Sequence, residues 1–187
     1  MKRDQNVLRT ERKTFTAGGF SIIELLIIMA IAGILMAIGL PSFVNFTRDV
    51  RAGSMMSTLT TDIQVARSES VKRNSRILFC AQANPATNDC TGAPAAAAWM
   101  NGWLVCYDRD SNGACDPSTA AEPNPIKVQA AIAAPLAVSG PAVNLVMLPT
   151  GSTSAGAVFT VTGGTAISRS ATIQPSGSVV TAKTGGN

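Results

Sequence analysis

The chain has 187 residues, of which 46% are hydrophobic and 14% are charged, a composition that suits one domain with a hydrophobic core and excludes a disordered chain. It contains no histidine, which excludes catalytic centres built on a Ser-His-Asp or Cys-His arrangement. The net charge is +4, but residues 1–19 contain five basic and two acidic residues, so the rest of the chain is nearly neutral. The overall charge therefore argues only weakly for a nucleic-acid partner.

The first forty residues have the pattern of a membrane anchor. Residues 20–40 contain a single charge, Glu24, and as a helix rising about 1.5 Å per residue they would span roughly 30 Å. Basic residues before this segment favour a cytoplasmic N-terminus. A secretory signal peptide fits less well, because Pro41 and Phe43 stand where a small-residue cleavage site is expected. A plain membrane anchor is the simpler interpretation.

A carboxylate inside an apolar helix is unfavourable in lipid and calls for a partner. The segment Gly19-Phe20-Ser21-Ile22-Ile23-Glu24 resembles the prepilin-peptidase site of type IV pilins and type II secretion pseudopilins. The resemblance implies that leader 1–19 is cut after Gly19, that Phe20 is N-methylated, and that Glu24 pairs with the amino terminus of a neighbouring subunit. It also implies that residues 20–47 serve first as a transmembrane helix and then in a filament core.

Helical periodicity resumes after Pro41. One apolar face is predicted to contain Met56, Leu59, Ile63, Ala66 and Ser70. The polar faces are expected to carry Arg48, Arg51, Asp62, Arg67 and Glu69. We therefore expect a long, interrupted helix over about residues 20–74, whose second half packs on a globular domain.

The end of this helix is basic, with Arg67, Lys72, Arg73 and Arg76. Positive charge near a helix C-terminus stabilises the helix by itself, and this is the favoured interpretation. Contact with DNA or another anion is the alternative.

The remaining sequence predicts β-strands separated by turn-forming residues. They are expected at residues 76–81, 99–107, 143–148, 157–161, 166–173 and 178–181, with a further candidate within 126–132. Residues 83–98 and 116–142 are expected to form loops, and residues 184–187 a loose end.

The four cysteines, Cys80, Cys90, Cys106 and Cys115, are expected outside the cytoplasm, where two disulfides form. Three connectivities are allowed. The local pairs Cys80–Cys90 and Cys106–Cys115 are favoured, and each would contribute roughly 2–3 kcal/mol by closing a short loop. A zinc site is disfavoured, because the cysteines lack Cys-x-x-Cys spacing.

The acidic segment 108–113 has the oxygen spacing of the start of a calcium-binding loop, with Asp108, Asp110 and Asn112. The twelfth position is Thr119, where such loops carry a bidentate glutamate. A simple Asx/Gly turn explains the same residues and is favoured, and a weak calcium site is the alternative.

Several segments beyond the apolar helix indicate which group of pilin-like proteins the chain resembles. They are residues 66–75, Cys80, Trp99, residues 102–105 and 108–113, and the stretch 169–179. They look like the corresponding parts of H-type pseudopilins and of FimT/FimU-type minor pilins. The resemblance implies an α+β type IV pilin fold, with a long N-terminal helix packed on an antiparallel β-sheet domain over residues 48–187. It implies no enzymatic activity and no cofactor.

The same resemblance implies partners and a location. The expected partners are other major and minor pilins, the prepilin peptidase, the inner-membrane assembly platform and the inner membrane. The chain would cross the inner membrane once, with its domain in the periplasm, and then enter a pilus at the cell surface.

Four functions compete on the sequence. The first is a minor pilin that starts or caps a type IV pilus. The second is a DNA-binding minor pilin that uses Arg169 and Lys183, together with the basic group Arg67, Lys72, Arg73 and Arg76, although Ser178 stands where an arginine is expected. The third is the H-type pseudopilin of a type II secretion system. A membrane-anchored enzyme is the fourth, and no nucleophile–base pair supports it.

Overall fold

The computed structural model describes residues 19–84, 86–119, 122–164 and 167–185, so the predicted leader lies outside the described residues except for Gly19. The chain divides into two compact units, Met1–Pro41 and Ser42–Asn187. A single helix, α1 (Ile22–Lys72), contributes residues to both.

Helix α1 is continuous from end to end, so the predicted interruption is not found. Gly33 and Pro41 both lie within the assigned helix. Each lowers local helix stability, but the hydrogen bonds of the neighbouring turns continue the helix across such a position. Glu24 lies in the first turn, where the positive end of the helix dipole favours a carboxylate.

Within the second unit, α1 buries the apolar face that the sequence predicts. Met56, Leu59, Ile63 and Ala66 are all at most 4% exposed. The prediction for Asp62 is wrong, because its side chain is fully buried rather than on a polar face. Its position on the helix borders the apolar face, and packing partners from the sheets cover it.

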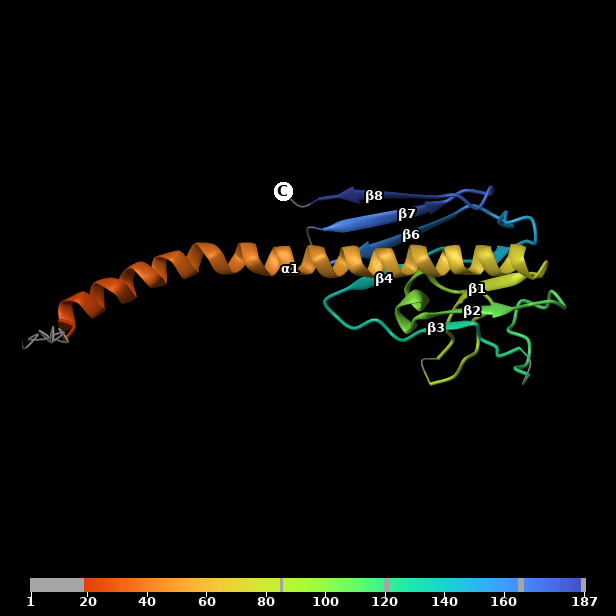
Figure 1. The fold of residues 1–187 in the computed structure, drawn as a ribbon, viewed down its shortest axis with the longest axis horizontal. Helices are drawn as coiled ribbons and strands as arrows, with labels where there is room; N and C mark the ends of the chain where they lie inside the picture. Colours follow the sequence, from red (N-terminus) through yellow and green to blue (C-terminus); the bar gives the residue numbers. More distant parts are fainter. Residues whose placement is uncertain (1–18, 85, 120–121, 165–166, 186–187) are drawn as a thin grey trace, which may run out of the picture. The chain divides into compact units, whose positions relative to one another are not determined.

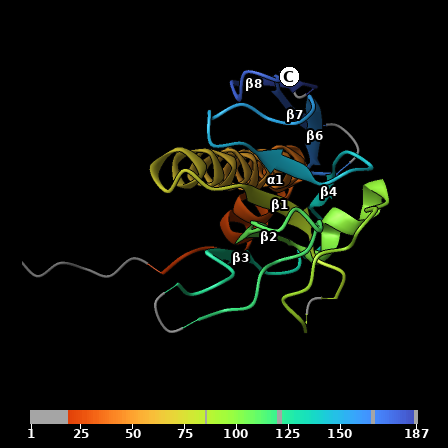
Figure 2. The same cartoon turned by 90° about the vertical axis from the view of Figure 1, so that its right-hand side faces the viewer.

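Two antiparallel sheets flank this part of α1 (Figure 1, Figure 2). The first has the strand order β3-β2-β1-β5. Its strands are β1 (Ile77–Ala81), β2 (Trp103–Tyr107), β3 (Lys127–Gln129) and β5 (Leu145–Met147). Residues of β1 and β2 are buried on both faces, because one face meets the helix and the other is covered by the loops that carry the disulfides.

The second sheet has the order β4-β6-β7-β8. Its strands are β4 (Ala137–Ser139), β6 (Ala157–Thr162), β7 (Ser168–Ile173) and β8 (Val179–Thr184). Strand β6 alternates between buried and more exposed residues, as expected when one face packs on a core and the other faces solvent. Figure 2, which looks along the helix, shows β6–β8 on one side of α1 and β1–β3 on the other.

The core joins the two sheets through a group of aromatic rings. Phe79 of β1 lies 5.7 Å from both Trp99 and Phe159, measured between ring centroids. Trp99 and Phe159 meet edge to face at 4.7 Å. Such pairs contribute about 0.5–1.5 kcal/mol beyond the burial of their area. Phe159 belongs to β6, so this cluster fastens the second sheet to the first.

The structure corrects three details of the predicted strands. Residues 99–101 belong to the 3-10 helix η1 (Ala96–Asn101), and β2 starts only after Gly102, whose φ of 93° ends that helix. Strand β4 lies in the predicted loop 116–142, because pairing with β6 overrides its weak local signal. Strand β8 continues to Thr184, where the sequence predicts a loose end.

Candidate functional site

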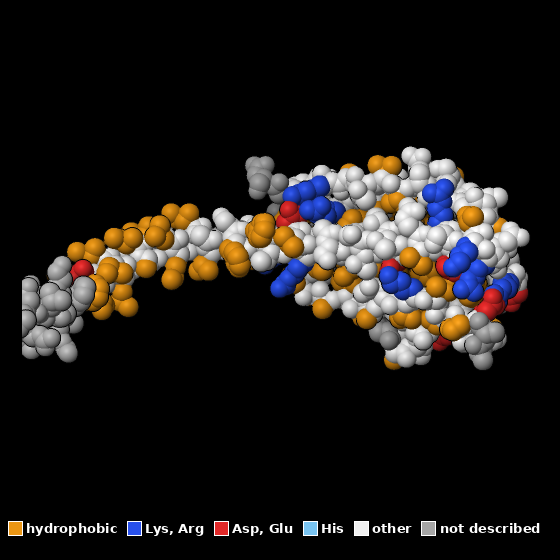
Figure 3. Space-filling model, in the orientation of Figure 1, with side chains coloured by type: hydrophobic (Ala, Val, Ile, Leu, Met, Phe, Trp, Pro, Cys, Tyr) orange, Lys and Arg blue, Asp and Glu red, His pale blue; other side chains and the backbone are white. Residues whose placement is uncertain are grey.

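The predicted processing segment lies immediately before α1. Gly19 and Phe20 are outside the helix, and the Phe20 side chain is 76% exposed. The helix then contains a stretch that is long and apolar enough to cross a membrane, and none of its side chains is buried within the described structure. Figure 3 shows the hydrophobic side chains along this stretch. A surface of this kind needs either lipid or other apolar helices around it.

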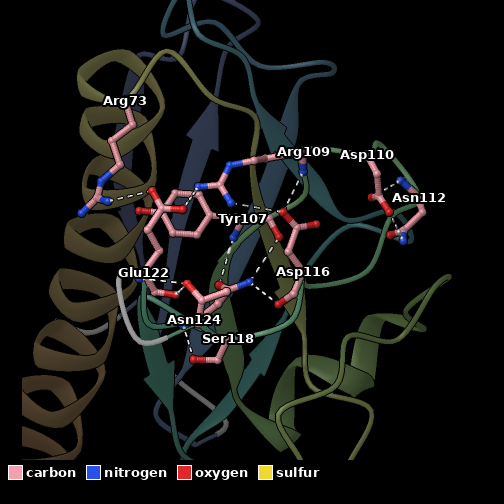
Figure 4. Close-up of polar contacts among 10 residues, drawn as sticks. Arg73, Tyr107, Arg109, Asp110, Asn112, Asp116, Ser118, Glu122 and Asn124 are labelled. Carbon is pink, nitrogen blue, oxygen red and sulfur yellow. Dashed lines mark hydrogen bonds and ion pairs between the residues drawn. The ribbon is translucent and has the colours of Figure 1, made fainter.

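At the other end of α1, a cluster of alternating charges surrounds the aromatic ring of Tyr107 (Figure 4). The guanidinium groups of Arg73 and Arg109 lie 5.4 and 4.4 Å from the ring centroid. Glu122 pairs with both arginines, and Arg73 also pairs with Glu69 at 2.7 Å. These contacts fasten the loop after β2 to the end of the helix.

The environment shifts two pKa values in this cluster. Burial raises the pKa of the Tyr107 hydroxyl above its ordinary value. The hydrogen bond to Glu69 raises the pKa of Arg73, so that arginine stays charged. A groove of about 210 Å³ lies beside the ring, between Arg73, Tyr107 and Glu122 and the prolines that follow Glu122.

In segment 108–113, the alternative calcium loop, the carboxylates accept hydrogen bonds from nearby groups of the protein. Asp108 is fully buried and accepts hydrogen bonds from Arg76 Nε at 3.1 Å and from the Gly113 backbone at 3.2 Å. Asp110 accepts from the backbone and side chain of Asn112. These contacts build an Asx/Gly turn. Asp116, which the sequence analysis does not single out, brings a third carboxylate to within 4.8 Å of Asp108 and Asp110.

A buried polar contact joins α1 to the first sheet. Asp62 accepts a hydrogen bond from Trp103 Nε1 at 2.9 Å and forms an ion pair with the Lys127 ammonium. The carboxylate is fully buried, whereas the Lys127 side chain is 41% exposed. Neither contact has a local signal in the sequence, because 41 positions separate Asp62 from Trp103.

The two C-terminal cations of the DNA hypothesis meet a single carboxylate on α1. Arg169 of β7 and Lys183 of β8 each donate to Asp49, both at 2.6 Å. The hydrogen bonds from Lys183 and Arg169 hold the pKa of Asp49 below its ordinary value. A groove of about 400 Å³ lies between α1 and β8 at this point, with Arg169, Lys183, Ser57 and Thr60 in its lining.

The helix-end cations of the DNA hypothesis lie elsewhere and are also engaged. Arg67 donates to the carbonyl oxygens of Gly151 and Ser176. Lys72 and Arg73 pair with Glu69, and Arg76 pairs with Asp108. The structure therefore does not bring the six candidates together into one basic surface.

The cysteines form the disulfides Cys80–Cys90 and Cys106–Cys115, the two local pairs favoured above. Cys80 and Cys106 lie on the outward face of the paired strands β1 and β2. The two bonds touch, with 3.4 Å between the Sγ atoms of Cys90 and Cys115. They cover an apolar patch of the first sheet that contains Leu78 and Leu104.

The family model of the type II transport protein GspH matches residues 56–178, which is most of the folded domain. The chain belongs to the GspH family. The GspH match runs from the buried face of α1 to the turn before β8, and so takes in both sheets and both disulfides.

Two crystal forms of the type IV minor pilin FimU from Pseudomonas aeruginosa, strain PAO1, resemble this GspH-family chain. One has 18% sequence identity and a TM-score of 0.50, and the match covers 72% of this chain and 90% of FimU. The other has 16% identity and a TM-score of 0.48, with 70% and 91% covered. Comparison with curated proteins gave no match. The predicted α+β pilin fold, with a long N-terminal helix packed on antiparallel sheets, is confirmed.

Proposed function

We propose that this GspH-family chain is a minor type IV pilin, a structural subunit that enters a pilus after prepilin peptidase cleaves between Gly19 and Phe20. One observation carries the proposal. Helix α1 contains a stretch of 23 residues without charge, Leu25 to Thr47, and continues into the GspH-family domain. Such a helix is stable in a bilayer, and the same apolar surface can pack against other helices in a filament core.

Glu24 gives this helix its proposed register. It is the one charged residue between Gly19 and Arg48. A carboxylate in an apolar filament core is tolerated when an ammonium group pairs with it. The new amino terminus at Phe20 of a neighbouring subunit would supply that group, so the pair would fix how far one subunit is shifted along the next. In a minor pilin this contact serves the start or the cap of the filament.

The proposal also assigns a location and partners. Before assembly, residues 20–47 cross the inner membrane with the N-terminus in the cytoplasm, and residues 48–187 form the periplasmic domain. The partners are then major and minor pilins, the prepilin peptidase and the assembly platform, and the mature subunit reaches the cell surface within the pilus.

A pseudopilin of a type II secretion system is the second candidate, because the matching family model carries the description of a type II transport protein. Deletion of the gene separates the two candidates, since loss of pili supports the first and loss of secreted enzymes supports the second. No observation favours the DNA-binding alternative, because its six candidate cations do not form one surface, and the four at the end of α1 each have a partner within the described structure.

Cleavage is tested by intact mass measurement on the chain from a host that contains a prepilin peptidase. We expect a mature chain that begins with N-methylated Phe20. Gly19→Leu is expected to block cleavage, whereas Gly18→Leu, the same change at the adjacent glycine, is expected to leave it unchanged. A wild-type mass that includes residues 1–19 contradicts the proposal.

Assembly is tested separately with Glu24. Glu24→Leu is expected to remain in the membrane fraction, correctly cleaved, but to be absent from sheared pili. Glu69→Gln, which removes a carboxylate from the domain end of the same helix, serves as the control. Normal incorporation of Glu24→Leu would rule out the pairing role.

A further inference from the structure

The net positive charge of the folded domain is concentrated beside the middle of α1, around Arg48 and Arg51. The C-terminal end of the helix and the loop beside it contain five basic and five acidic residues, and so are neutral: Arg67, Lys72, Arg73, Arg76 and Arg109 against Glu69, Asp108, Asp110, Asp116 and Glu122. Lys127 is balanced by Asp62, and Asp89 adds one negative charge outside both groups, so residues 48–187 carry a net charge of +2. The excess positive charge therefore lies in the four remaining cations of the domain, Arg48, Arg51, Arg169 and Lys183, which we call the basic collar.

Two parts make up the collar: Arg48 and Arg51 are near neighbours on α1, and Arg169 and Lys183 are joined to the same helix through Asp49. Asp49 lies between Arg48 and Arg51 on α1 and accepts hydrogen bonds from Arg169 and Lys183. With one carboxylate against four cations, the collar keeps a net charge of +3. Lys and Arg side chains lie on both sides of the helix at this level (Figure 3).

Three features leave the collar able to bind an anion. Arg51 is exposed, and neither Arg48 nor Arg51 has an ion pair within the described residues. The groove between α1 and β8 adds the hydroxyl groups of Ser57 and Thr181 beside Arg169 and Lys183. The Nε atom of Arg169 is buried and lacks a hydrogen-bond partner within the described structure. Arg and Lys side chains bind phosphate oxygens through strong, charge-assisted hydrogen bonds.

The sequence indicates which phosphates come within reach. Arg48 is the first charged residue after Glu24, and the 23 uncharged residues between them rise roughly 34 Å as a helix, close to the thickness of a bilayer core. The first cations beyond such a span meet the headgroups of the leaflet in which the span ends. Basic residues next to a membrane segment bind anionic lipid by electrostatic attraction.

We propose that the basic collar binds the phosphate groups of anionic phospholipids and holds the domain against the membrane surface before assembly. This inference rests on the proposed function, because it requires α1 to span the membrane. Each collar cation is expected to strengthen the association about fivefold, and salt is expected to weaken it. Transfer into a filament would then require the collar to exchange lipid phosphates for contacts with neighbouring subunits.

The test uses the full chain in lipid nanodiscs made of phosphatidylcholine, with an increasing fraction of phosphatidylglycerol. Hydrogen–deuterium exchange is measured over residues 48–53 and 179–184. We expect protection to rise with the phosphatidylglycerol fraction and to fall with added salt. Arg48→Gln/Arg51→Gln is expected to raise the fraction needed for half protection at least fivefold.

A matched pair of variants controls for loss of charge alone. Arg51→Gln and Lys72→Gln each remove one exposed cation from α1, but only Arg51 belongs to the collar. We expect Arg51→Gln to weaken the lipid effect and Lys72→Gln to leave it unchanged. An equal effect of both variants would show that general charge, not the collar, attracts lipid, and would overturn the proposal.

Further outcomes also decide against the collar. Equal exchange in neutral and anionic nanodiscs overturns it, as does equal protection by soluble glycerol phosphate, which would indicate a site for a free phosphate. Protection by a short DNA duplex without protection by phosphatidylglycerol identifies nucleic acid as the ligand instead. A chain that fails to co-elute with nanodiscs overturns the proposed membrane-spanning function itself, so the two failures are distinguishable.

Discussion

The ion pair of the buried Asp62 with Lys127 offers a direct test of how α1 is held on the first sheet. We consider Lys127→Met, which keeps the length of the side chain and removes its charge. The Asp62 carboxylate would stay fully buried, with the Trp103 indole at 2.9 Å as its remaining hydrogen-bond partner within the described structure. Removing one partner of a buried ion pair destabilises a protein by about 3–5 kcal/mol.

The expected loss is smaller than that range, because the Lys127 side chain is 41% exposed and water partly screens the pair. We expect Lys127→Met to lower the free energy of unfolding by about 2–3 kcal/mol, which corresponds to roughly 5–10 °C in Tm for a domain of this size. The measurement is thermal unfolding of the full chain in a non-ionic detergent, followed by near-ultraviolet circular dichroism. Lys72→Met, at a solvent-exposed position whose pair with Glu69 is 3.9 Å long, is expected to change the free energy by less than about 0.5 kcal/mol.

The double variant Asp62→Leu/Lys127→Met separates the charge from the packing. It leaves no buried carboxylate, so its loss should be at least about 1 kcal/mol smaller than the sum of the two single losses. The indole of Trp103 would still lack its acceptor, so full recovery is not expected. A Lys127→Met protein as stable as the wild type, or single losses that simply add, would refute the claim that this ion pair compensates a buried charge.

Three further predictions concern other parts of the domain. Gly140→Ala would place a methyl group 2.6 Å from Trp99 Nε1, so a loss of about 1–3 kcal/mol is expected in urea unfolding, whereas Gly92→Ala, which meets open space, should be nearly neutral. Tyr107 is the single tyrosine of the chain, so the absorbance of ionised tyrosine at alkaline pH reports this residue directly. Because burial raises the pKa of its hydroxyl, we expect ionisation above pH 10 in the folded protein and at about pH 10 in urea. Stability should therefore fall as the pH rises above 10, and a folded-state midpoint at or below 10 would contradict the assigned burial. The lowered pKa of Asp49 contributes stability that is present above its ordinary pKa of 3.8 and is lost as the pH falls through the lower pKa of the folded state. Asp49→Asn should therefore make stability depend less on acid pH. An acid-unfolding curve unchanged by this substitution would disprove the role of Asp49.

Patterns formed by residues close together in the chain were sufficient to predict the long helix and most of the strands. The 3.6-residue period identified the buried face that contains Met56, Leu59 and Ile63, because a helix repeats its environment at that spacing. The uncharged stretch of α1 was equally visible, since only the order of residues defines it. The alternation of β6 likewise follows from the two-residue period of a strand.

Contacts between distant residues were decided by the tertiary structure alone. Asp49 meets Arg169 and Lys183 across 120 and 134 positions, and no local pattern reports such a pairing. Asp62 looked like a surface residue, because its burial depends on an indole and an ammonium group that other strands bring to the helix. The residues of strand β4 have only a weak local preference for a strand, and the strand forms because it pairs with β6. The sequence by itself thus determined the helix, the predicted processing motif and the pilin-like class, because these depend on neighbours in the chain. The charge partners, and with them the basic collar, depend on neighbours in space.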